Sequence, residues 1–131
     1  MIRGFIALLF ASFFIQDINA QQAFYKSTDD LRLYDHKTYK LVDASLFPVY
    51  ARQEHVVGSK ARVTEIKYYF SKDERSPIMP LTINNLKFAF PRNKDFHDLL
   101  DLQFRNNRDL MKYDSYYSEY KLKSVFKKAI S

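Results

Sequence analysis

The C-terminal part of the sequence combines tyrosine and lysine in a pattern suited to binding a ligand. Aromatic rings stack on the flat faces of sugars and bases, and ammonium groups neutralise nearby anionic groups. The same pattern is typical of a core element whose outer face is coated with lysine, because lysine stems cover apolar surface. Exposure of the tyrosine rings in the folded protein would distinguish these two interpretations. The candidate binding residues are Tyr113, Tyr116, Tyr117, Tyr120, Lys121, Lys123, Lys127 and Lys128.

Groups suited to catalysis are sparse. The chain has no cysteine and no Gly-x-Ser-x-Gly motif, and Gly58 is the only glycine after residue 20, which excludes a glycine-rich phosphate loop. His36, His55 and His97 each stand alone, which is typical of surface histidines rather than of a metal site. One pair has a suitable spacing, since His97 and Asp101 lie four residues apart on an expected helix. A small metal-dependent hydrolase is therefore an alternative, but the sequence favours a noncatalytic protein with no cofactor and no metal site.

The first 20 residues have the three zones of a secretory signal peptide. Arg3 supplies the positive charge, residues 5–15 are almost entirely apolar, and a polar stretch then leads to Ala20. A helix that spans the hydrocarbon core needs about 20 apolar residues, so an uncleaved anchor is the poorer interpretation. We expect cleavage before Gln21 and an exported product, periplasmic or secreted. Without cysteine there is no acceptor for a lipid anchor at the cleavage site.

Composition predicts one folded domain over residues 21–131. Removal of the signal peptide leaves roughly 110 residues, enough for a single core. Aromatic residues make up 17% of the chain and hydrophobic residues 47%, which argues against disorder. The net charge of +6 favours contact with anionic surfaces, although solubility alone also explains a charge of this size.

The expected strands lie in residues 39–78. Residues 21–37 are polar and are expected to form a flexible or lightly packed arm. Gly58 and Ser59 suit a type II′ hairpin turn before the clearest strand, residues 62–70. One face of that strand, containing Thr64, Ile66, Tyr68 and Phe70, is expected to pack, while the opposite face stays in water.

After Pro80 the apolar period changes to that of a helix. Thr82 is expected to cap a first helix that ends before Pro91, and Asn93 to begin a second one. Residues 116–122 fit either extended chain or helix, and a basic amphipathic helix is expected to end the domain. Apolar stripes of the three helices are Ile83, Leu86 and Phe90; Phe96, Leu99, Leu100 and Phe104; and Leu122, Val125, Phe126, Ala129 and Ile130.

These patterns predict an α+β domain. An antiparallel sheet of three or four strands, from residues 39–78, would be covered by helices from residues 82–130. Whether residues 115–131 form a packed element or an exposed binding tail stays open at this level.

Residues 79–126 resemble a group of small exported proteins of Bacteroidetes. The resemblance rests on Pro80-Leu81-Thr82, Asn85-Leu86, Phe90, Pro91, Asn93, Phe96 and Leu99, and later on Leu110, Tyr113-Asp114 and Tyr120-Lys121-Leu122. It implies export and an α+β fold with a helical C-terminal half. The group has no established activity, so the resemblance implies no function.

The function expected from the sequence is that of an exported, noncatalytic binding module for an anionic component of the cell envelope. The alternative is an accessory subunit whose apolar tail docks to a larger envelope protein. Nucleic acid is not an expected partner of an exported protein, no membrane span is expected in the mature chain, and the oligomeric state is open.

Overall fold

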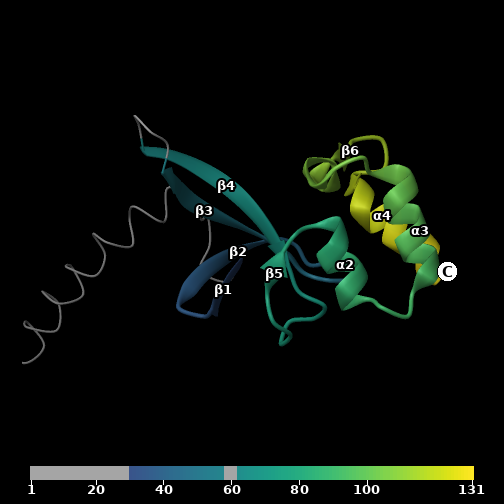
Figure 1. The fold of residues 1–131 in the computed structure, drawn as a ribbon, viewed down its shortest axis with the longest axis horizontal. Coiled ribbons are helices and arrows are strands. Elements are labelled where there is room, and N and C mark those ends of the chain that lie inside the picture. The colour runs from purple at the N-terminus through teal and green to yellow at the C-terminus, as the bar shows by residue number, and fades with distance from the viewer. Residues whose placement is uncertain (1–29, 58–61) are drawn as a thin grey trace, which may run out of the picture.

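A computed structural model describes residues 30–57 and 62–131 of the chain. The expected signal peptide over residues 1–20, the first part of the expected arm and the Gly58–Ser59 turn lie outside these residues. Within them the protein is an α+β structure, as the sequence predicts, with a sheet at one end and helices at the other (Figure 1).

The sheet has five antiparallel strands rather than three or four. In spatial order they are β1 (Leu31–Tyr34), β2 (Lys37–Asp43), β3 (Val49–Val57), β4 (Arg62–Phe70) and β5 (Met79–Pro80). β1 falls where the sequence predicted an arm. Its turn to β2 has Asp35 and His36 at φ 49° and 60°, the backbone that a two-residue type I′ hairpin needs, and aspartate and histidine tolerate it better than most residues.

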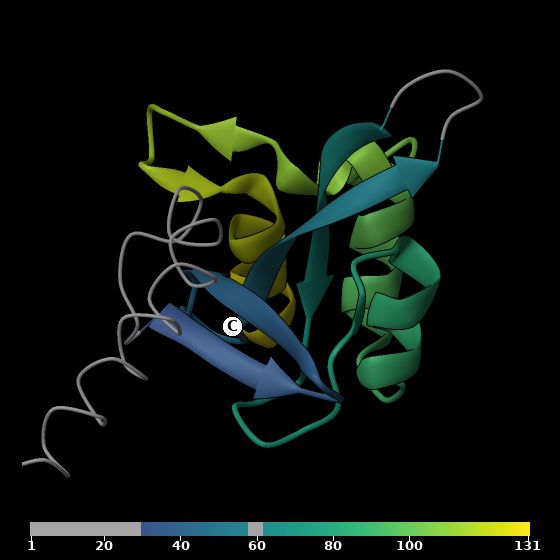
Figure 2. The same cartoon turned by 90° about the vertical axis from the view of Figure 1, so that its left-hand side faces the viewer.

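Three α-helices, a 3-10 helix and a small hairpin follow the sheet. They are α2 (Ile83–Ala89), α3 (Lys94–Gln103), η2 (Asn107–Met111), the hairpin of β6 (Tyr113–Asp114) and β7 (Glu119–Tyr120), and α4 (Lys121–Ile130). The predicted caps are confirmed: Thr82 Oγ1 accepts from Asn85 N at 3.0 Å, and Asn93 Oδ1 accepts from Phe96 N at 3.0 Å. Figure 2 shows the β6–β7 hairpin beside the start of α4.

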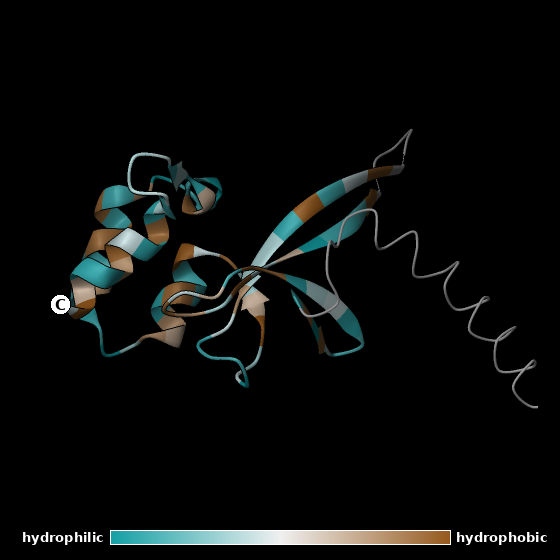
Figure 3. Ribbon diagram, turned by 180° about the vertical axis from the view of Figure 1, so that it is seen from behind, coloured by the Kyte–Doolittle hydropathy of each residue, from teal (hydrophilic) through white to brown (hydrophobic). Residues whose placement is uncertain are grey.

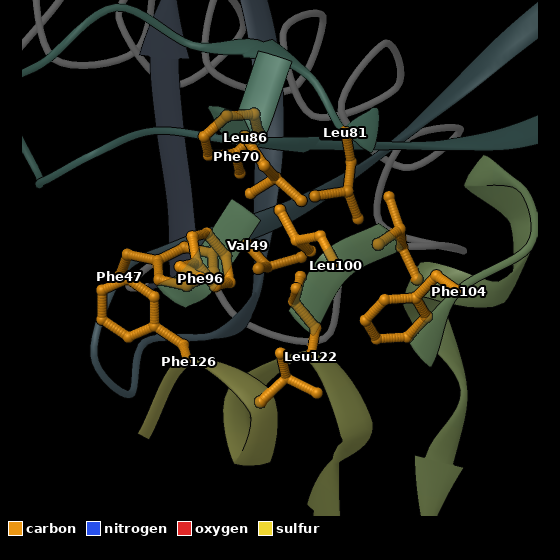
Figure 4. Packing of buried hydrophobic residues seen from close by; sticks show 12 residues of the cluster. Phe47, Val49, Phe70, Leu81, Leu86, Phe96, Leu100, Phe104, Leu122 and Phe126 are labelled. Carbon is orange, nitrogen blue, oxygen red and sulfur yellow. The ribbon is translucent and has the colours of Figure 1, made fainter. Parts of the chain in front are cut away.

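The main core lies between the base of the sheet and the helices (Figure 4). Phe47, Phe90, Phe96 and Phe126 pack edge-to-face or tilted, with ring centroids 5.0 to 5.7 Å apart. Such geometries suit the ring quadrupole better than a face-to-face sandwich does. The predicted helical stripes supply most of this core, although Ile130 is exposed.

A smaller cluster of Tyr39, Tyr50 and Ile78 lies apart from the main core. On β3, Val49 belongs to the main core and its neighbour Tyr50 to the small cluster. Successive side chains of a strand point to opposite faces. The sheet is therefore buried on both faces at the base of β3.

The outer parts of β3 and β4 extend away from the helices as a two-stranded ribbon (Figure 3). Of the residues expected to pack on one face of β4, Phe70 does so, but Ile66 and Tyr68 do not. Phe70 is fully buried, whereas Ile66 is 45% exposed and Tyr68 is also exposed. The reason is that the helices cover only the base of the sheet.

Candidate functional site

The β6–β7 hairpin presents two tyrosines at its tip. Asp114 Oδ1 accepts hydrogen bonds from the backbone N of Tyr116 at 2.9 Å and of Tyr117 at 3.3 Å. An aspartate that caps the following backbone in this way fixes a tight turn. Ser118 completes the turn with φ 52°. The backbone, rather than side-chain packing, therefore sets the position of these two tyrosines.

Three of the four candidate tyrosines are exposed. Tyr116 is 84%, Tyr117 67% and Tyr113 56% exposed, while Tyr120 is half-buried. The rings form two edge-to-face pairs, Tyr116 with Tyr117 at 4.8 Å and Tyr113 with Tyr120 at 5.1 Å between centroids. Burial raises the pKa of Tyr120, and nearby Tyr68, Asp43 and Tyr113 add to this shift. A binding face requires exposed rings, but Tyr113 and Tyr120 lie on the opposite face of the hairpin from Asp114 and Glu119.

A groove of about 440 Å³ runs between this hairpin, α3 and α4. Leu99 and Val125 give it an apolar part, and Tyr117 supplies an aromatic wall. A cavity of this volume lies within the range of small-ligand sites. Its polar lining is Gln103, Asp114, Glu119, Lys121, Ser124, Lys127 and Lys128.

The lysines along the groove differ in the ion pairs and hydrogen bonds that they form. Lys127 Nζ lies 2.6 Å from Glu119 Oε2, and Ser124 Oγ donates to Glu119 Oε1 at 2.5 Å. These two hydrogen bonds lower the pKa of Glu119, and the one from Lys127 has the larger effect. Lys121 Nζ donates to Gln103 O at 3.3 Å. Lys128 is exposed, and its ammonium has no ion-pair partner among the residues that the structure describes.

Lys123 does not lie on this surface, so we leave it out of the candidate site. Its side chain is 1% exposed and points into the molecule. Nζ donates hydrogen bonds to the carbonyl oxygens of Ser45 and Phe47. It also lies 3.4 Å from the carbonyl oxygen of Asp43 and 3.6 Å from the Asp43 carboxylate. Burial lowers the pKa of Lys123 to about 8, although Asp43 acts in the opposite direction.

The structure therefore brings four of the eight candidate residues, Tyr117, Lys121, Lys127 and Lys128, to the groove, and Tyr116 is exposed at the adjacent hairpin tip. We call these four groove residues, of which Lys121 is half-buried, the tyrosine–lysine surface. The sequence analysis missed Asp114 and Glu119, which organise it. Aspartate often accepts hydrogen bonds from the backbone N–H groups two and three residues later, and this turn signal could have identified Asp114.

The alternative pair His97 and Asp101 is engaged elsewhere. His97 Nε2 lies 2.8 Å from the carbonyl oxygen of Phe90. Both carboxylate oxygens of Asp101 accept from Lys87 Nζ, at 2.7 and 2.8 Å. In the described part of the chain, no three histidine, aspartate or glutamate side chains are grouped so that they could hold a metal ion.

Comparison with models of known protein families, with curated proteins and with solved structures found no match. Over residues 30–57 and 62–131, no helix combines the length and apolar character needed to cross a membrane.

Proposed function

We propose that the protein is an exported, noncatalytic binding module that contacts an anionic component of the cell envelope through the tyrosine–lysine surface. The observation that carries this proposal is the exposure of Tyr117 in a groove lined by lysines. Exposed aromatic rings that adjoin a groove are typical of ligand-binding and interaction sites.

The charges of the groove support an anionic ligand with polar groups of its own. The Lys128 ammonium is available to an anion, whereas Glu119 already neutralises Lys127. Asp114 and Gln103 offer acceptor and donor groups for hydroxyls. An anionic polysaccharide carries both kinds of group, and its rings can stack on Tyr117.

The second candidate function is that of an accessory subunit of a larger envelope complex. Apolar side chains exposed away from the groove, such as Phe88 on α2 and Leu102 on α3, favour protein contacts. The geometry does not favour the hydrolase alternative, because His97 and Asp101 are each hydrogen-bonded to a different group.

Retention on a resin of sulfated dextran, compared with unmodified dextran, tests the anionic ligand. We expect retention at about 0.01 M salt and its loss by about 0.15 M, because screening shortens the reach of exposed charges from about 30 to about 8 Å. Absence of retention at the lower salt concentration would contradict the proposal.

Paired variants test whether the contact is local. Lys128→Gln should weaken retention more than Lys72→Gln, which removes the same charge from an exposed position between β4 and β5. Tyr117→Ala should weaken it more than Phe88→Ala, which removes an exposed ring from α2. Equal effects within each pair would mean that retention depends only on the net charge of the protein or on nonspecific adsorption.

A further inference from the structure

Among residues 30–57 and 62–131, no strand covers most of the outer edge of β4. One edge of β4 pairs with β3 from Arg62 to Phe70. On the other edge β5 pairs only with Tyr69 and Phe70, and Leu81 N donates to Tyr68 O at 3.0 Å. Among the described residues, no strand pairs with this edge over residues 62–67 (Figure 1).

Backbone groups along this edge are ready to pair. The carbonyl of Tyr68 faces the β5 side, since it accepts from Leu81. Alternate residues of a strand direct their N–H and C=O groups to the same side, so those of Ile66 and Thr64 also face outward. An edge of this kind is a template on which another extended chain can add as a strand.

An unbalanced charge accompanies the free edge. Glu65 lies directly opposite Glu54 of β3. Glu54 is bound by Tyr69, by Arg52 at 2.8 Å and by Lys67 at 3.3 Å. No cation is paired with Glu65 among the described residues. Like charges placed opposite each other destabilise a strand pair, so a positive charge next to Glu65 would be favourable.

A second copy of the chain cannot supply the positive charge opposite Glu65. Two-fold pairing centred on Ile66 would place Lys67 of one copy opposite Glu65 of the other. It would also place Thr64 opposite Tyr68, whose carbonyl Leu81 already occupies, and the preceding residues would overlap β5. The occupant that sets a cation opposite Glu65 is therefore a different chain that ends, or turns away, before it reaches β5.

We propose that the β4 edge over residues 62–67 binds an extended segment of another protein by antiparallel strand addition. The segment carries lysine or arginine opposite Glu65, between two apolar β-branched residues opposite Thr64 and Ile66. The Glu65 position is a non-hydrogen-bonded pair, in which the two side chains lie closest. On the other face, the exposed Ile66 side chain supplies an apolar contact.

Fluorescence anisotropy of labelled peptides with the full mature chain at low ionic strength tests this site. The probe has Thr-Val-Lys-Val-Thr at its centre. We expect it to bind roughly three- to tenfold more tightly than the same peptide with glutamate for lysine. A third peptide, N-methylated at both valines, lacks the donors for the β4 carbonyls and should not bind.

Charge reversal on the protein supplies the matching control. Glu65→Lys removes the Glu54–Glu65 repulsion, so it should fold, and it should reverse the preference between the lysine and glutamate peptides. Glu74→Lys makes the same change at an exposed position outside the strands and should leave the preference unchanged. Binding of the N-methylated peptide as tightly as the probe, no binding of the probe to the unaltered chain, or the same effect from both substitutions would overturn the proposal.

Discussion

The ammonium of Lys123 lies 4.5 Å from the centroid of the Phe47 ring and donates a hydrogen bond of 2.5 Å to the Phe47 carbonyl oxygen. Lys123 belongs to α4, and Phe47 to the connection between β2 and β3. With its further hydrogen bond to Ser45 O and its contact with Asp43, this one side chain ties the last helix to the sheet.

Replacement of Lys123 by methionine should lower the free energy of unfolding by about 3 kcal/mol at pH 7. Methionine fills a similar volume, but it leaves up to three carbonyl oxygens without a donor, at about 1 kcal/mol or more for each buried group. Denaturation in urea measures the change. Lys127→Met is the control, since it breaks a more exposed ion pair with Glu119 and should cost less than about 1 kcal/mol. Equal costs would show that the buried ammonium is not a tether.

Stability should rise between pH 8 and pH 10. The pKa of Lys123 is about 8 in the folded protein and 10.5 in the unfolded chain, so the unfolded chain binds more protons over this interval. Lys123 alone should therefore raise the free energy of unfolding by about 2 kcal/mol between these pH values, and ionisation of tyrosines in the unfolded chain should offset about 1 kcal/mol of this by pH 10. At higher pH stability should fall again, because burial raises the pKa values of folded Tyr39, Tyr69 and Tyr120 above their usual 10.0.

Urea unfolding at a series of pH values checks this profile. Lys123→Met should remove the rise between pH 8 and pH 10 while keeping the fall above it. A rise that persists in this variant would assign it to another group.

Local signals in the sequence were sufficient to predict α2 and the start of α3. Thr82 and Asn93 cap their helices through side chains that bond three residues ahead, and such interactions depend only on neighbouring residues. Pro91 likewise ends α2 by its own covalent geometry. These features need no knowledge of distant parts of the chain.

Distant contacts explain the failures. Alternation along β4 predicts which residues share a face, but how far the helices reach over that face depends on the whole fold, and Ile66 lies beyond them. Periodicity counts Lys123 with the polar positions of α4, yet its long side chain reaches carbonyls of residues 43–47. β1 was missed because its four residues are stabilised by a partner strand and by Arg32.

Arg32 should be essential for the attachment of β1. Its guanidinium donates to Tyr50 Oη at 2.9 Å, to Ser71 Oγ at 3.1 Å and to the carbonyl of Ser76 at 2.7 Å. Arg32→Met should lower the free energy of unfolding by about 2–3 kcal/mol, because charged hydrogen bonds are lost and the fully buried Ser71 loses one donor. Hydrogen exchange should show β1 amides losing protection first.

The control for Arg32 is Arg92→Met, at an exposed position that follows α2. This variant should change stability by less than about 0.5 kcal/mol. If Arg32→Met behaved in the same way, β1 would be held by its backbone hydrogen bonds to β2 alone.

Replacement of Leu46 by glycine should stabilise the protein, although it removes an apolar side chain. Leu46 has φ 67°, and Phe47 N donates to Ser45 O across it at 2.7 Å, which makes it the centre of a tight turn with positive φ. A residue with a Cβ pays about 1–3 kcal/mol of strain in such a backbone, which glycine avoids. Against this gain, the greater conformational entropy of glycine in the unfolded chain costs about 0.5–1 kcal/mol. Leu46→Gly should therefore raise the free energy of unfolding by about 1 kcal/mol in urea.

Leu46→Ala separates backbone relief from loss of the side chain. Alanine keeps the Cβ, so it should not stabilise, and it loses only the contacts of a side chain that is 45% exposed. The turn persists in spite of its strain because the carbonyls on both sides of Leu46, those of Ser45 and Phe47, are held by the Lys123 ammonium. The two sites should consequently be coupled: in the Lys123→Met background the turn is free to relax, and the gain from Leu46→Gly should shrink. An undiminished gain in the double variant would mean that the strain at Leu46 is independent of Lys123.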